Sequence, residues 1–118
     1  MPTLITITKL ADHCLLVVPS IDLIRSSAYD FYHQIQDRIT IDPHRVIVII
    51  DLSSIDYVDS VFWSRIISLV QRVEKIIFVG LTPPSVINFH SLGMAAICML
   101  ADNLEQAKRM AKVVPKHK

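Results

Sequence analysis

An aspartate and a serine, Asp59 and Ser60, stand where an apolar segment has ended and an amphipathic helix is expected to begin. In open α/β sheets, functional sites collect at the carboxyl ends of strands. A hydroxyl at a helix N-terminus faces unpaired backbone N–H groups and the positive end of the helix dipole, so a phosphate there would be stabilised. Phosphorylation of Ser60 would add about −1.5 to −2 charges beside Asp59. The alternative is an ordinary helix cap, which contributes about 1 kcal/mol.

Two aromatic residues, Phe62 and Trp63, directly follow this pair. One helical face cannot bury every large apolar residue of this segment equally, so at least one of the two aromatics is expected to be exposed beside Ser60. An exposed aromatic side chain there would be a contact anchor for a protein partner. The alternative is that both side chains pack in the core.

Other kinds of chemistry find little support in the sequence. The chain has only two glycines, which excludes glycine-rich loops of the Walker A and dinucleotide-binding types, and it contains no Gly-x-Ser-x-Gly elbow. Asp51 lacks the acidic pair and the lysine that a phospho-aspartate receiver needs, so it is expected to cap or orient the loop after its strand. The five histidines are scattered and suggest no metal site: His13, His33, His44, His90 and His117. The sequence therefore predicts no enzyme and no cofactor, and any phosphate on Ser60 must come from another protein.

The elements that position Ser60 follow from hydrophobic periodicity. Residues 4–10 and 14–18 predict an antiparallel hairpin, and the continuous apolar run at 46–52 predicts a central parallel strand buried on both faces. Further strands are expected at 75–81 and 97–100. The first helix is expected to start near Ser20 to Ser26, to continue its apolar stripe to Ile39 and to end at Asp42-Pro43. Further helices are expected at 60–73, 82–92 and about 103–113. The order β-β-α-β-α-β-α-β-α predicts an α/β fold: a mostly parallel sheet with an antiparallel first strand and about four helices.

Composition sets the class of protein. The 118 residues are 52% hydrophobic and carry a net charge of +1, which predicts one domain spanning residues 1–118 and no nucleic-acid partner. No apolar run approaches the roughly 20 residues of a membrane span, so the protein is expected in the cytoplasm. Cys14 and Cys98 lie in apolar segments and are expected to be free thiols. Basic residues near the end of the chain (Lys108, Arg109, Lys112, Lys116 and Lys118) predict a solvated helix face, with an anionic partner as the alternative.

Three segments resemble the STAS family of bacterial anti-sigma factor antagonists. The first is DLSSIDYVDSV at 51–61, in which a strand leads through a short loop to the Asp-Ser pair; the others are FVGLTPPSV at 78–86 and ADNLEQAK at 101–108. Within the family the chain is most similar to the RsbS-type stressosome subunit. The bulky residues Val61, Phe62 and Trp63 follow Ser60, whereas many sporulation-type antagonists have Ser-Gly-Leu, with a glycine directly after the serine. The missing glycine argues against direct capture of an anti-sigma factor.

The resemblance implies a function. Ser60 would be the phospho-acceptor, Asp59 its neighbour, and Asp22 part of a polar loop beside the site. The unphosphorylated protein would bind and sequester a switch serine/threonine kinase (RsbT-like) within an assembly of other STAS proteins (RsbR-like) or its own copies. Phosphorylation of Ser60 under stress would release the kinase for signalling. The alternative is a STAS accessory subunit of a transporter or lipid-transport ATPase, in which phosphorylation plays no part.

Overall fold

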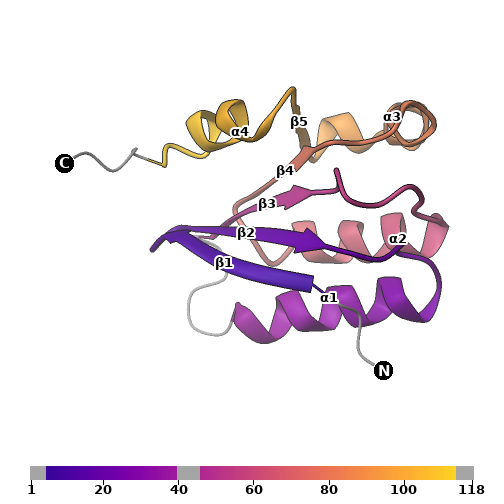
Figure 1. The fold of residues 1–118 in the computed structure, drawn as a ribbon, viewed down its shortest axis with the longest axis horizontal. Helices are drawn as coiled ribbons and strands as arrows, with labels where there is room; N and C mark the ends of the chain where they lie inside the picture. The colour runs from indigo at the N-terminus through magenta and orange to yellow at the C-terminus, as the bar shows by residue number, and fades with distance from the viewer. Residues whose placement is uncertain (1–4, 40–45, 114–118) are drawn as a thin grey trace.

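The computed structural model describes residues 5–39 and 46–113, and its elements alternate between strands and helices (Figure 1). The strands are β1 (Ile5–Ala11), β2 (Cys14–Pro19), β3 (Ile47–Asp51), β4 (Lys75–Val79) and β5 (Met99–Ala101). The helices are α1 (Ser26–Arg38), α2 (Ser60–Val70), α3 (Pro83–Ser91), the short 3₁₀ helix η2 (Met94–Ala96) and α4 (Leu104–Met110). The predicted order of strands and α-helices is confirmed, while η2 was not predicted.

The strands form one sheet in the order β1-β2-β3-β4-β5. β1 pairs antiparallel with β2, and every other pair is parallel. Each parallel neighbour is reached through a helix, as parallel pairing requires. The predicted α/β architecture, with an antiparallel first strand and four α-helices, is therefore confirmed.

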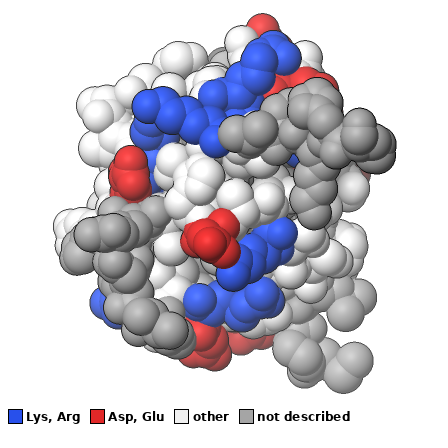
Figure 2. Space-filling model, turned by 90° about the vertical axis from the view of Figure 1, so that its left-hand side faces the viewer, with Lys and Arg blue, Asp and Glu red and all other residues white. Residues whose placement is uncertain are grey.

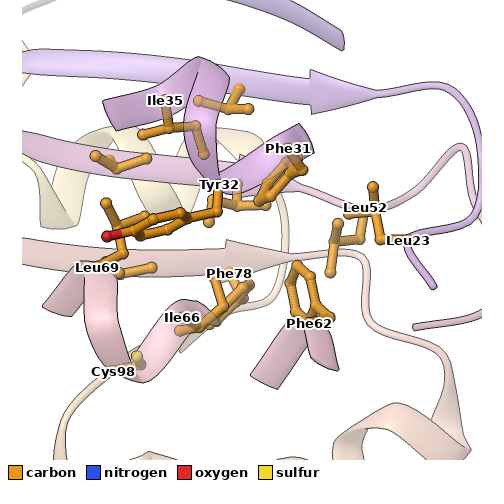
Figure 3. Close-up of a cluster of buried hydrophobic side chains, with 14 of the residues drawn as sticks. Leu23, Phe31, Tyr32, Ile35, Leu52, Phe62, Ile66, Leu69, Phe78 and Cys98 are labelled. Carbon is orange, nitrogen blue, oxygen red and sulfur yellow. The ribbon is translucent and has the colours of Figure 1, made fainter. Parts of the chain in front are cut away.

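The central strand β3 separates two apolar cores. Val48 and Ile50 point to the larger core, which α1 and α2 cover, whereas Ile47 and Ile49 point to a smaller core closed by Ala107 of α4. This alternation is the two-residue period of a strand, and burial on both faces confirms what the continuous apolar run predicted. Figure 3 shows the larger core, where residues of α1, such as Phe31, meet residues of α2 and β4.

The ends of the helices follow from their capping residues. The side chain of Thr82 accepts a hydrogen bond from the Ser85 N–H at the start of α3, and that of Asn103 accepts one from the Gln106 N–H at the start of α4. Gly93, with φ 73°, follows the C-cap of α3 as predicted. α2 ends at Val70, earlier than the expected 73. The predicted stop of α1 at Asp42-Pro43 lies outside the described residues.

Within the described ranges, every helix is too short or too polar to cross a membrane.

Candidate functional site

Ser60 is the first residue of α2 and is exposed to solvent. The helix that it begins, α2, follows the carboxyl end of β3 in the chain and is labelled at the right of Figure 1. Asp59 is the N-cap of α2, and its Oδ1 accepts a hydrogen bond from the Phe62 backbone N–H at 3.2 Å. The sequence-predicted juxtaposition of a hydroxyl, a carboxylate and a helix start is therefore present, and Ser60 is accessible from outside.

The second oxygen of Asp59 ties this helix start to another loop. Its Oδ2 accepts a hydrogen bond from the Arg25 N–H at 2.9 Å, and the Asp59 N–H donates to the Leu23 carbonyl at 3.2 Å. Leu23 also forms an isolated parallel bridge with Val58. The β2–α1 loop and the β3–α2 loop are thus joined beside Ser60.

Asp22 also links the β2–α1 loop to the β3–α2 loop. Its Oδ1 accepts hydrogen bonds from the Asp56 N–H at 2.9 Å and the Tyr57 N–H at 3.1 Å. One carboxylate therefore fixes the turn that precedes Asp59. Asp22 lies in the loop beside the site, and its carboxylate holds two backbone N–H groups of the neighbouring loop.

The expectation that Phe62 or Trp63 is exposed is wrong. Phe62 is 0% and Trp63 3% exposed, and their rings pack on Phe78 at centroid distances of 6.1 and 5.6 Å (Figure 3 shows Phe62 and Phe78 in the core). α1 packs against α2, and Phe89 of α3 contacts Trp63. These neighbours cover enough of the circumference of α2 to bury both aromatic side chains. The large apolar residue left outside is Ile67, at 45% exposure. Buried side chains cannot anchor a partner on this surface.

A groove that sequence reasoning missed runs alongside Ser60. It is lined by Tyr29 of α1 and by four residues of α2: Ser60, Val61, Ser64 and Arg65. The Arg65 guanidinium carbon lies 5.5 Å from the ring centroids of both Tyr29 and Tyr32, which is the range of cation–π contact. The spacing of residues 60, 61, 64 and 65 indicates one helical face. The groove forms because α1 packs against α2 and Tyr29 of α1 supplies its second wall, and this contact between helices is not visible in the sequence.

The first residues of the β3–α2 loop, which directly follow β3, are held in place by contacts among Asp51, Ser53 and Gly80. Asp51 Oδ1 accepts a hydrogen bond from the Ser53 N–H at 2.9 Å, which confirms that Asp51 orients the loop. Gly80 has φ 79°, and a Cβ built on it would lie only 2.7 Å from the Ser53 nitrogen and 2.9 Å from its Cα. Glycine is needed here for both its conformation and its size.

The remaining candidate groups lie away from Ser60. Burial raises the pKa of Cys14 to about 11 and that of Cys98 to about 12, so both free thiols are poor nucleophiles. No cluster of metal-ligating side chains occurs in the described residues. Figure 2 shows the left-hand side of the molecule in Figure 1, where Lys and Arg side chains gather at the top, on the side of α4. Those of the described part of this segment are Lys108, Arg109 and Lys112.

Comparison with known proteins links this geometry to one fold. No protein-family model matches the sequence, and the search of curated proteins also gives no match. Among solved structures, the unphosphorylated form of the anti-sigma factor antagonist SpoIIAA matches 95% of this chain and 100% of its own, with a TM-score of 0.75 and 14% identity. A second match is a putative anti-sigma factor antagonist from Thermotoga maritima, with a TM-score of 0.71 and 14% identity over 94% of this chain and 93% of that one.

The phosphorylated form of Bacillus SpoIIAA also matches, with a TM-score of 0.63 and 16% identity over 91% of this chain and 99% of its own. At such identities the likeness concerns the backbone alone. The sheet order, the antiparallel first strand and the four α-helices of this chain are those of the SpoIIAA-type STAS fold.

Proposed function

We propose that this chain is a regulatory STAS protein of the anti-sigma factor antagonist type, which acts by binding a switch serine/threonine kinase rather than by catalysis. The kinase is bound while Ser60 is unmodified and is released once Ser60 carries a phosphate. The observation that carries the proposal is the exposed hydroxyl of Ser60 at the first position of α2, directly beside the capping carboxylate of Asp59.

The negative charge of the phosphate on Ser60 would cause release of the kinase. Phosphorylation adds a group of about −1.5 to −2 charges next to the carboxyl group of Asp59. A partner surface that fits the neutral serine meets a concentrated negative patch after transfer, and like-charge juxtaposition costs several kcal/mol.

Exposed apolar side chains offer the contact surface that Phe62 and Trp63 do not. Ile21, Ile24 and Tyr57 are 39%, 41% and 58% exposed, and all lie on the two loops that Asp22 and Asp59 join. An apolar patch beside a switchable charge is the arrangement expected of a reversible protein interface.

The finer assignment is to the RsbS type. Under this proposal the kinase is RsbT-like, the protein works in the bacterial cytoplasm, and it assembles with RsbR-like STAS proteins or with its own copies in a stressosome. The three sequence segments described above support this type. The fold supports the phosphorylation cycle, because SpoIIAA with the same fold has been solved in phosphorylated and unphosphorylated forms.

The decisive experiment incubates the protein with an RsbT-like kinase and ATP and reads the intact mass. Wild type should gain one phosphate and Ser60→Ala none. Ser64→Ala is the matched control, because Ser64 is an exposed serine one turn further along the same helix. Phosphate on Ser60→Ala, or none on wild type, would rule out the mechanism.

A further inference from the structure

Among the residues that line the groove beside Ser60, one side chain is cationic, that of Arg65, and none is a carboxylate. The lining residues are Tyr29, Ser60, Val61, Ser64 and Arg65. Arg65 makes no ion pair within residues 5–39 and 46–113. The positive charge of the groove is therefore not neutralised by a described side chain.

Arg65 is also held in place. Its guanidinium lies 5.5 Å from the ring centroids of Tyr29 and Tyr32, and Tyr32 is 9% exposed. Two aromatic faces restrict the side chain before any ligand arrives, so little conformational entropy remains to be lost on binding. A long, flexible cation would not normally be ordered in this way on a surface.

Arg65 shares its groove with Ser60. Five residues separate the two positions on α2, which corresponds to a rise of about 7.5 Å along the axis and a rotation of about 140° around it. The helix alone therefore does not bring the two side chains together. What places the cation beside Ser60 is the groove that both residues line with Tyr29 of α1, and the lean of helical side chains toward the N-terminus shortens the distance along the axis.

A phosphate on Ser60 needs such a cation because the helix start is already occupied by an anion. Asp59 Oδ1 takes the Phe62 N–H, and the Trp63 N–H bonds the Asp59 carbonyl at 3.4 Å. The carboxylate also sits at the positive end of the helix dipole. The backbone donors that usually receive a phosphate at a helix start are thus partly used.

We propose that Arg65 holds the phosphate on Ser60, as an ion pair formed within the Tyr29–Arg65 groove. This inference rests on the proposed modification of Ser60, and it names the residue that positions the modified side chain. The pair is a charge-assisted contact between a planar guanidinium and phosphate oxygens.

The test uses protein with phosphoserine installed genetically at position 60, so that its outcome does not depend on any kinase. The second pKa of the phosphate, near 6 for a free phosphoserine, is followed by ³¹P NMR. In wild type this pKa should be lower than in Arg65→Gln by about half a unit, the size expected of a partly exposed ion pair. Arg65→Lys should restore only part of the difference. High salt should reduce it.

Three further variants test whether the effect belongs to Arg65. Arg72→Gln removes an exposed arginine just beyond the far end of α2 and should leave the phosphate pKa unchanged. Arg25→Gln removes an arginine whose backbone N–H bonds Asp59, and His33→Gln removes an imidazole whose ring lies 4.5 Å from that of the groove residue Tyr29. An unchanged phosphate pKa in Arg65→Gln, or a shift that instead requires Arg25 or His33, would overturn the proposal.

Discussion

The carboxylate of Asp59 accepts a hydrogen bond from the backbone N–H of Arg25 at 2.9 Å, which links the starts of α1 and α2. Arg25 has φ 48° and ψ −117°, a conformation that non-glycine residues rarely adopt. The same carboxylate caps α2. Asp59 therefore holds a strained turn and a helix start at once, immediately beside the proposed phospho-acceptor.

Asp59→Ala should lower the free energy of unfolding by about 1–3 kcal/mol, since both the helix cap and the Arg25 N–H lose their acceptor. Urea denaturation measures the loss. Asp56→Ala is the control, because the hydrogen bond of Asp56 to Asp22 uses only its backbone N–H, and its effect should stay within about 0.5 kcal/mol. Equal stabilities of the two variants would contradict this account of Asp59.

Gly80→Ala should destabilise the fold more than Gly93→Ala. Both glycines have positive φ, at 79° and 73°, so both substitutions carry the same backbone cost of about 1 kcal/mol. Only at Gly80 does the added Cβ meet Ser53, whereas nothing lies within 4 Å at Gly93. We expect the difference in unfolding free energy to be about 1–3 kcal/mol, the range of overpacking. A smaller loss for Gly80→Ala would show that the Ser53 loop moves aside.

Ser60→Asp should weaken binding of an RsbT-like kinase by about tenfold or more, which corresponds to about 1.4 kcal/mol. The reason is like-charge repulsion at the interface, and the fold should be unaffected because an acidic residue is favourable in the first turn of a helix. Calorimetric titration with the purified kinase measures the affinity. Ser64→Asp adds the same charge one turn away and should weaken binding less. Equal affinity of wild type and Ser60→Asp would argue against release by charge.

The two thiols should be unreactive in the folded protein. Burial raises the pKa of Cys14 to about 11 and of Cys98 to about 12, so the thiolate fraction at pH 8 is very small. Labelling with a chromogenic disulfide should proceed only as fast as the protein unfolds, and urea should accelerate it. Because the folded-state pKa is raised, the protonated thiols support the fold below the unfolded-state pKa, and this support is lost as pH rises toward 11–12. Immediate labelling of either thiol without denaturant would be inconsistent with its burial.

Hydrophobic periodicity predicted the fold because each strand and helix of this chain carries its own pattern. Residues 47–50 form a continuous apolar run and lie in the centre of the sheet. Asp59 and Ser60 could also be placed from sequence, since the N-cap and first turn depend on neighbours only a few residues away. Local signals were sufficient for these features.

What the sequence did not predict depends on contacts between distant elements. Phe62 and Trp63 are both buried because α1 packs against α2 and Phe89 of α3 reaches Trp63, which no pattern within α2 reveals. Likewise Arg65 is ordered by Tyr29 and Tyr32, more than thirty positions earlier in the chain. The exposed apolar residues Ile21, Ile24 and Tyr57 lie on two separate loops that the carboxylates of Asp22 and Asp59 join, which the sequence pattern does not indicate.

The burial of the apolar residues of β3 also has a consequence for the chain before it folds. The stretch 46–50, which includes four residues of β3, is VIVII, entirely β-branched and uncharged, and this is the composition of stretches that stack into amyloid-like fibrils. In the native sheet both of its edges are hydrogen-bonded to β2 and β4, so no template is offered to another molecule. Arg45 and Asp51 flank the stretch in sequence as charged gatekeepers that oppose self-association during synthesis.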